Sequence, residues 1–276
     1  EKMEFKLGAG ISSDDTLLNV RTYYTGGSAQ TFDWKNITVT KPEDWSGTTG
    51  LKPIKLLTGS ANLSIDNYDL SKYNNVTSDG KFEYGWRADL TTATPGTPTT
   101  ITGVQNIFFD RNQFKGANKT LTTPPTNPGN VAYGGLSTLG NTTTGNKLTL
   151  DGGGVDNVGA SFIGNAYGGY TKAEAGDSTK NEIVLTGKAY VLGNVYGGWA
   201  DNGDATNNTV TLDGSGSLGF SYMKLYGGGS NKAGADVVTG NTLKVTAKGN
   251  TADSLWNFEK MEFKLGAGIS SDDTLL

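Results

Sequence analysis

The sequence contains no cysteine and no histidine, and these two absences exclude much chemistry. Without cysteine there is no disulfide, no cysteine-ligated zinc site and no thiol nucleophile. Without histidine the chain lacks the commonest general base and the commonest ligand of transition metals. We therefore expect no metal site and no cofactor, and we assign no catalytic residue.

Positive charge is also scarce. The chain has 276 residues and a net charge of −4, and its only arginines are Arg21, Arg87 and Arg111. Such a chain is poorly equipped to hold phosphate groups, so we expect no nucleic-acid partner. No run approaches the roughly 20 apolar residues of a membrane-spanning helix, and no signal peptide is visible. We expect no membrane insertion by this segment and place any targeting or anchoring segment outside it.

Glycine, in contrast, is abundant. The chain has 41 glycines together with 12 tyrosines, 10 phenylalanines and 5 tryptophans. The glycines follow no three-residue period, which excludes a collagen-like helix, and the aromatic residues argue against disorder. Helix-forming runs are nearly absent. This composition predicts an all-β protein with many tight turns.

Four segments in the second half of the chain share one plan. Each has an apolar residue, tyrosine and two glycines, then a polar loop of variable length, then asparagine and a short alternating run. Repeats of about 30 residues that cannot bury their own apolar face are typical of solenoids. The tyrosines are Tyr133, Tyr167, Tyr196 and Tyr226, and the asparagines are Asn146, Asn181, Asn208 and Asn241.

Each part of the repeat has a physical interpretation. In NKLTL, Leu148 and Leu150 point to one side of the chain while Lys147 and Thr149 point to the other, which is the pattern of a half-buried strand. The glycine pair predicts a sharp corner, because glycine adopts backbone angles that other residues avoid. Asparagine tolerates left-handed angles at a turn, and stacked asparagines are able to form a hydrogen-bonded ladder.

These patterns predict a parallel β-helix with regular coils over residues 131–258. Residues 1–130 are expected to form an irregular β-solenoid half with extended loops, in which NITV from Asn36, NLSI from Asn62 and NIFF from Asn106 are strands. The alternative is an antiparallel sandwich, which the scarcity of two-residue hairpin turns disfavours.

The first eighteen residues, EKMEFKLGAGISSDDTLL, recur unchanged at 259–276. Three explanations are possible. The parent protein is a tandem array in which 259–276 starts the next repeat, the overlap is engineered, or the segment is a local duplication. We favour the array, because residues 251–258 lead into the second copy without a linker. The expected partners are adjacent copies of the same repeat, end to end. The junction is expected to bury Met3, Phe5, Leu7, Met261, Phe263 and Leu265.

Repeats such as VYGGWADNGDATNNTVTLDG (195–214) resemble the passenger domains of large bacterial autotransporter adhesins, which are type V secreted proteins. The resemblance covers residues 131–276 and 1–20, whereas 21–130 match loosely. It implies a right-handed parallel β-helix at the outer surface of a bacterium, with a signal peptide and a membrane barrel outside this segment. The motifs specify a scaffold and no ligand.

We expect a non-enzymatic structural repeat of a cell-surface stalk or filament that serves attachment. The alternative is an adhesin domain that binds a host or bacterial glycan or protein through loops in 41–130, because loops on a rigid scaffold commonly carry binding. Tyr170 and Trp199 follow the glycine pair, and we interpret them as covering the neighbouring coil.

A polysaccharide-acting enzyme is the third possibility, since two carboxylates at a suitable separation can cleave a glycosidic bond. We interpret the paired aspartates and the DNGD segment of Asp201 and Asp204 as ordinary turns, and we expect none of the candidates to be catalytic. Whether Asp201 and Asp204 bind calcium stays open. The candidates are Asp14 and Asp15, their copies Asp272 and Asp273, Asp201 with Asp204, and Asp110 with Arg111.

Overall fold

The structure is a computed structural model. It describes residues 3–7, 16–20, 30–33, 36–40, 54–59, 63–68, 74–78, 80–89, 99–101, 106–123, 125, 130–153, 161–162, 164–172, 175–214 and 223–264. These residues are nearly all β and include no α-helix. The chain divides into two compact units, unit 1 (Glu1–Asn112) and unit 2 (Gln113–Leu276), which are described separately. None of the described residues belongs to a helix long and apolar enough to cross a membrane.

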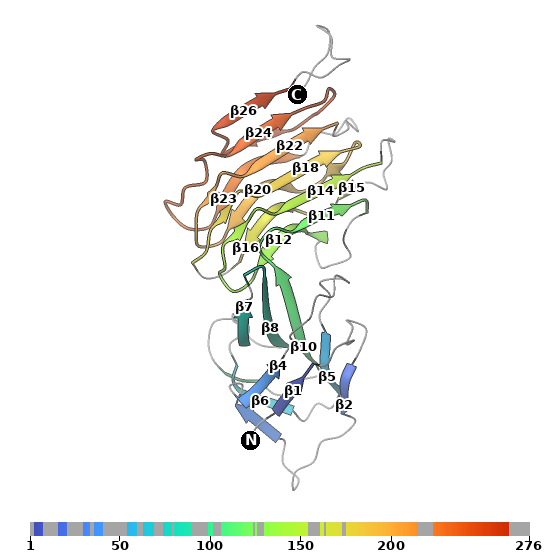
Figure 1. The fold of residues 1–276 in the computed structure, drawn as a ribbon, viewed down its shortest axis with the longest axis vertical. Helices are drawn as coiled ribbons and strands as arrows, with labels where there is room; N and C mark the ends of the chain where they lie inside the picture. The colour runs from blue at the N-terminus through green and yellow to red at the C-terminus, as the bar shows by residue number, and fades with distance from the viewer. Residues whose placement is uncertain are drawn as a thin grey trace. The chain divides into compact units, whose positions relative to one another are not determined.

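Unit 2 is a parallel β-solenoid, which confirms the predicted fold class (Figure 1). Each neighbouring pair in its six-stranded sheet is parallel, so the antiparallel alternative is excluded for this unit. The strands stack in the order β11 (Asn118–Leu121), β14 (Lys147–Asp151), β18 (Glu182–Thr186), β22 (Thr209–Asp213), β24 (Thr242–Val245) and β26 (Lys260–Phe263).

Three further parallel sheets complete the coils of unit 2. The five-stranded sheet contains β12 (Ala132–Ser137), β16 (Ala166–Thr171), β20 (Asn194–Ala200), β23 (Lys224–Ser230) and β25 (Ser254–Trp256). The two smaller sheets contain β13 (Thr143–Thr144), β17 (Ser178–Thr179) and β21 (Ala205–Thr206), and β15 (Ser161–Phe162) with β19 (Tyr190–Val191).

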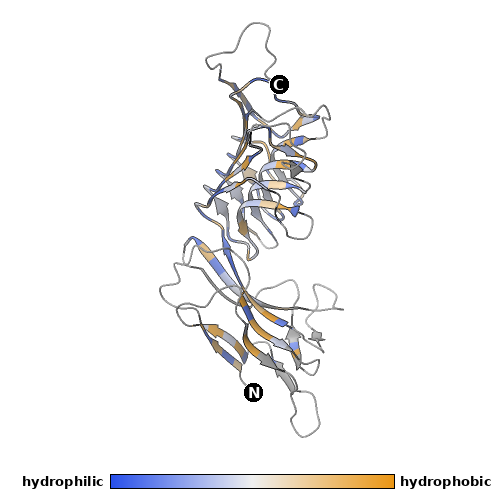
Figure 2. Cartoon of the chain, turned by 90° about the vertical axis from the view of Figure 1, so that its right-hand side faces the viewer, coloured by the Kyte–Doolittle hydropathy of each residue, from blue (hydrophilic) through white to orange (hydrophobic). Residues whose placement is uncertain are grey.

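The core of unit 2 consists of rows, each formed by one register position in successive strands. Figure 2 shows apolar and polar residues alternating along the stacked strands, as the sequence predicts. The side chains that β14, β18, β22 and β24 contribute to these rows are buried. One row runs Leu148, Ile183, Val210, Leu243 and Met261, and a second runs Leu150, Leu185, Leu212, Val245 and Phe263.

The first strand of the stack breaks the apolar pattern. Lys119 of β11 lies in register with Leu148, so a charged residue stands at the start of the first core row. Its Nζ donates a hydrogen bond to the carbonyl oxygen of Tyr133 at 3.1 Å. This end of the stack therefore carries a polar group, whereas the row ends in Met261 at β26.

Unit 1 has its own core, which includes Tyr84, Trp86 and Ile107. It contains β1 (Met3–Lys6) with β4 (Ile37–Thr40), and the sheet β3 (Gln30–Asp33), β6 (Leu63–Tyr68) and β9 (Thr99–Ile101). Its largest sheet has the order β2 (Thr16–Val20), β5 (Ile54–Gly59), β10 (Asn106–Gln113), β8 (Phe82–Asp89) and β7 (Asn74–Ser78).

The first half departs from the prediction in two respects. The segments at Asn36, Asn62 and Asn106 do form strands, but β10 runs antiparallel to β5, because alternation identifies a strand without fixing the direction of its neighbour. The regular stack also starts before residue 131, since β11 already pairs with β14. Residues 41–53 and 91–98, in the predicted loops, lie outside the described residues.

Candidate functional site

Four buried asparagines connect successive coils of unit 2. Asn146, Asn181, Asn208 and Asn241 each precede a strand of the six-stranded sheet and are at most 1% exposed. Each Oδ1 accepts a hydrogen bond, between 2.8 and 3.1 Å, from the backbone N–H of the equivalent residue in the preceding coil. The donor at the first of these steps is Ala117, so the ladder starts in the coil of β11.

The amide nitrogens of the same asparagines complete the ladder. Each Nδ2 donates to a backbone carbonyl in the preceding coil, at distances between 2.8 and 3.1 Å. The Nδ2 of Asn146 also donates to Oδ1 of Asn181 at 2.8 Å, and that of Asn181 donates to Oδ1 of Asn208 at 3.2 Å. The predicted hydrogen-bonded ladder is therefore confirmed.

The left-handed backbone angle belongs to the residue before each ladder asparagine. Gly145, Lys180, Asn207 and Gly240 have φ values of 65°, 56°, 57° and 70°. The ladder asparagines have no positive φ, so asparagine is required for its two-sided hydrogen bonding. The tolerance of left-handed angles that the sequence suggested is used one residue earlier.

The prediction that the glycine pairs form corners is wrong, because they lie inside strands. Gly134 and Gly135 belong to β12, and the equivalent pairs belong to β16, β20 and β23. A Cβ on Gly134 would lie 2.2 Å from the carbonyl oxygen of Gly168, and one on Gly135 would lie 2.3 Å from the side chain of Asn146. Glycine is needed because these strands pass directly against the ladder and the neighbouring backbone.

The four repeat tyrosines form one column on the five-stranded sheet. Successive ring centroids of Tyr133, Tyr167, Tyr196 and Tyr226 are 5.6, 5.0 and 4.7 Å apart, with interplanar angles of 12°, 7° and 22°. Trp256 of β25 continues the column at 6.3 Å. Because the stacked rings cover one another's faces, the column offers sugars no row of open ring faces. Its contacts serve to hold the coils together.

Tyr170 and Trp199 lie beside this column. Their ring centroids are 4.9 Å from those of Tyr167 and Tyr196 respectively. A Cβ on Gly229 of the next coil would lie 2.4 Å from Cε3 of Trp199, so this indole covers the neighbouring coil, as predicted.

The carboxylates of the DNGD loop hold loops together. Oδ1 of Asp201 accepts hydrogen bonds from Nε1 of Trp199 at 2.8 Å, from Oη of Tyr170 at 3.2 Å and from Nδ2 of Asn231 at 3.2 Å. Oδ1 of Asp204 accepts from the N–H of Asp236 at 3.0 Å. Among the described residues, no three His, Cys, Asp or Glu side chains gather as a metal site would require.

Of the other candidate carboxylates, only Asp110 lies among the described residues. Asp110 is buried on β10 in unit 1. Asp14, Asp15, Asp272 and Asp273 lie outside the described residues.

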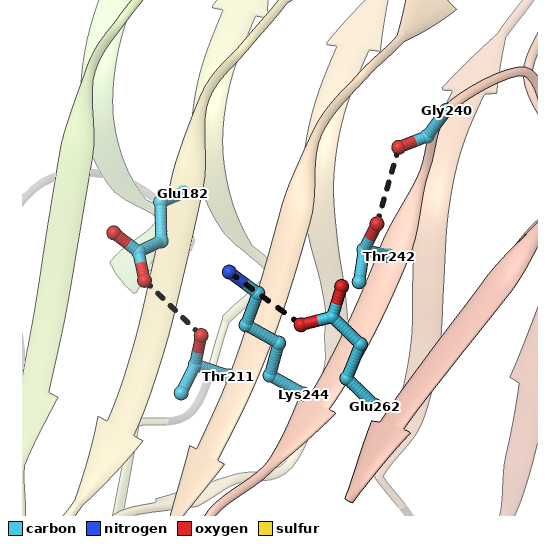
Figure 3. Close-up of polar contacts among 6 residues, drawn as sticks. All are labelled: Glu182, Thr211, Gly240, Thr242, Lys244 and Glu262. Atoms are coloured by element: carbon cyan, nitrogen blue, oxygen red, sulfur yellow. Dashed lines mark hydrogen bonds and ion pairs between the residues drawn. The ribbon is translucent and has the colours of Figure 1, made fainter. Parts of the chain in front are cut away.

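Polar side chains link strands on the outer face of the six-stranded sheet (Figure 3). Oγ1 of Thr211 donates to Oε1 of Glu182 at 3.1 Å, and Nζ of Lys147 lies 3.1 Å from Oε2 of Glu182. Nζ of Lys244 lies 3.9 Å from Oε2 of Glu262 on β26. These exposed ion pairs contribute little stability, but they favour one register.

The two copies of the duplicated segment have different surroundings. In unit 1, Phe5 and Leu7 are 7% and 6% exposed, and Met3 packs against the same core. In unit 2, Met261 and Phe263 occupy core register positions but are 51% and 50% exposed. The expected burial is thus present in the first copy and absent in the described part of the second. Leu265 lies outside the described residues.

Burial shifts the pKa of several groups in unit 2. It raises the pKa of Tyr196 to about 12, against the opposing effect of the hydrogen bond with Asn194. Burial also raises the pKa of Tyr133, Tyr167 and Tyr170. In the opposite direction, burial lowers the pKa of Lys119 to about 8, since it disfavours the ammonium.

We expect the free energy of unfolding to rise between about pH 8 and pH 10 and to fall at higher pH. The folded pKa of Lys119 lies below the usual lysine value of 10.5, so the penalty of burying its charge disappears as pH rises through that window. The folded pKa of Tyr196 lies above the usual tyrosine value of 10.0, so the unfolded chain loses that proton first and the free energy of unfolding falls above pH 10. Urea unfolding across this pH range measures both the rise and the fall of the free energy of unfolding.

The variant Lys119→Gln provides the control for the pH profile. In this variant the free energy of unfolding should no longer rise between about pH 8 and pH 10, but it should still fall at higher pH, because the tyrosine column is unchanged. A wild-type stability that already declines from pH 8 would contradict the assignment.

The chain matches no protein-family model, no curated protein and no solved structure.

Proposed function

We propose that the chain is one structural repeat of a long bacterial cell-surface stalk or filament that serves attachment, and that it is not an enzyme. The observation that carries this proposal is the state of the last described coil. Met261 and Phe263 continue the core rows of Leu243 and Val245, yet about half of each side chain is exposed. A solenoid end that presents core side chains to water requires a cap or a neighbouring coil.

The two ends of the stack in unit 2 differ, and the difference supports attachment of a neighbouring repeat at the end formed by β25 and β26. Lys119 places a charged group in the first core row at β11. Trp256, Met261 and Phe263 leave large apolar side chains exposed at the coil of β25 and β26. Exposed apolar clusters of this kind mark interaction surfaces. The identity of residues 259–276 with residues 1–18 supports a second repeat as the neighbour.

The non-enzymatic role is supported by the uses of the carboxylates in unit 2. Asp201 and Asp204, two of the candidates for acid–base chemistry, accept hydrogen bonds within their own loops and those of adjacent coils. The proposed location, the outer surface of a bacterium as part of an autotransporter passenger, rests on the resemblance of the YGG repeats. A cysteine-free, glycine-rich β-solenoid is compatible with it.

Chains that carry one, two and four repeats should form rods whose length grows by a constant increment per repeat. Electron micrographs of the purified chains measure that increment, and glycan and cell-binding assays on the same samples should show no saturable binding. If a single repeat binds saturably, and shortening residues 41–53 or 91–98, which leaves β5 and β9 intact, abolishes that binding, the adhesin alternative replaces the stalk.

A further inference from the structure

We propose that the MEFKL strand is built to lie between two repeats, paired on one edge with β24 of its own repeat and on the other with β4 of the next. The occupant of the open edge of β26 is then the strand Ile37–Thr40 of a second copy. The proposal rests on the proposed function, since it specifies how successive repeats join. It follows from comparing the two copies of the same sequence, Met3–Leu7 and 261–265.

The two copies use opposite edges of the strand. In unit 1 the N–H of Leu7 donates to the carbonyl oxygen of Thr40 at 2.8 Å. In unit 2 the N–H of Lys264, which is the copy of Lys6, donates to the carbonyl oxygen of Val245 at 2.9 Å. Residues 6 and 7 are neighbours, and the N–H groups of neighbouring residues in a strand point to opposite edges. One MEFKL strand can therefore bind β24 and β4 at the same time.

The two copies also present the same face to the core. Met261 and Phe263 are in register with Leu243 and Val245. Met3 and Phe5 are in register with Ile37 and Val39 of β4; Phe5 and Ile37 belong to the core of unit 1, and Val39 packs against it. A shared strand would continue both core rows across the junction without a change of face, which a register shift of one residue would forbid.

The outer face of the strand is compatible with both neighbours. Glu262 forms an ion pair with Lys244 of β24 (Figure 3). Its copy, Glu4, is in register with the uncharged Thr38, and Lys6 is in register with Thr40. No like charges therefore face each other across either edge. The burial of Phe5, 7% exposed against 50% for Phe263, shows how much apolar surface such a junction covers.

The absence of native cysteine allows a disulfide to test this pairing. We would mix the full chain carrying Glu262→Cys with a second chain that carries Thr38→Cys and lacks residues 1–7, so that its β4 is uncovered. The register Glu4↔Thr38 places the two cysteines opposite each other in neighbouring strands, at about 4.8 Å between Cα atoms, within disulfide range. Mild oxidation should give a mixed dimer on a non-reducing gel.

Three controls sharpen this experiment. Lys248→Cys in place of Glu262→Cys puts an exposed thiol outside β26 and should give no specific dimer. Phe263→Asp added to the Glu262→Cys chain should lower the yield about tenfold or more, because it replaces the ring that the junction would bury with a charged group. A peptide of residues 1–8 should compete for β4. Equal yields across these samples would overturn the proposal.

A second experiment, in which two repeats are joined in one chain, tests the same pairing if the shortened chain does not fold. Residues 1–276 are continued directly by residues 19–276, so that the two repeats share one MEFKL strand. Glu262→Cys and, in the second repeat only, Thr38→Cys should form an intramolecular disulfide. The single chain with Glu4→Cys and Thr38→Cys is the positive control. A folded two-repeat chain whose two thiols stay free would overturn the junction.

The outcomes separate this inference from the proposed function. If the rods bind no ligand and lengthen by a constant increment per repeat, but the disulfide does not form, the stalk function is supported and the shared strand is rejected. If the disulfide forms and a single repeat binds a ligand saturably, the shared strand is supported and the inert stalk is rejected.

Discussion

Replacing Asn208 with leucine should lower the free energy of unfolding by about 3 kcal/mol. The Asn208 side chain is fully buried, accepts the N–H of Asn181 at 3.0 Å and donates to the carbonyl oxygen of Ser178 at 2.9 Å. Leucine is similar in size but has no polar atom, so both backbone groups would stay unpaired in the core. Each such group costs about 1–3 kcal/mol. Urea unfolding followed by tyrosine fluorescence measures the loss.

The matched control for Asn208→Leu is Asn118→Leu. Asn118 is the exposed first residue of β11, next to the position where the ladder starts. The same change of side chain should there alter stability by less than about 0.5 kcal/mol. A similar small effect at Asn208 would contradict the view that the ladder holds the coils together.

Gly168→Ala should destabilise the chain by about 3 kcal/mol, at the upper end of overpacking effects. Its Cβ would lie 2.4 Å from the carbonyl oxygen of Gly197 and 3.0 Å from the backbone of Glu182. Both contacts are backbone atoms of adjacent strands, so no side chain can rotate away. Thermal and urea unfolding of the purified variant report the change.

Gly145→Ala adds the same methyl group in open space and separates collision from backbone strain. Nothing lies within 4 Å of a Cβ at Gly145, whose φ is 65°. Lys180 and Asn207 adopt the same conformation at the equivalent positions in neighbouring coils. We expect a cost of about 1 kcal/mol. An equal loss in both variants would show that packing against Gly168 is looser than the distances indicate.

The sequence was informative wherever a residue type has one dominant reason to recur. The alternation in NKLTL and its equivalents predicted the strands and their buried faces, and the recurring asparagines predicted the ladder. Glycine was ambiguous, because conformational freedom and close approach both favour it. Only the contact of Gly135 with Asn146 shows that close approach is the reason.

Other features depend on long-range geometry that no local pattern encodes. The antiparallel pairing of β10 with β5 joins two strands that lie far apart in the sequence, and the alternation within each strand does not encode its direction relative to the other. The convergence of Tyr170 and Trp199 on Asp201 joins residues of two coils, and the loop of β20 alone gives no sign of it. The signal that sequence reasoning missed is GANKTL (116–121), in which Gly116 corresponds to Gly145 and the following strand to KLTL, one coil early.

The hydrogen bonds of the ladder run from coil to coil, and this direction determines how the stack responds to force. A force along the stack, which pulls β14 away from β24, acts along the direction of the hydrogen bonds between successive coils. The strands at an end should therefore peel away one coil at a time. Because Asn146, Asn181 and Asn208 make equivalent contacts, successive coils should yield at similar loads. If the chain serves as the proposed stalk, an anchored cell under flow would be held by a tether that lengthens in small, equal steps and reforms when the tension drops, rather than by a rigid rod that detaches at its weakest point.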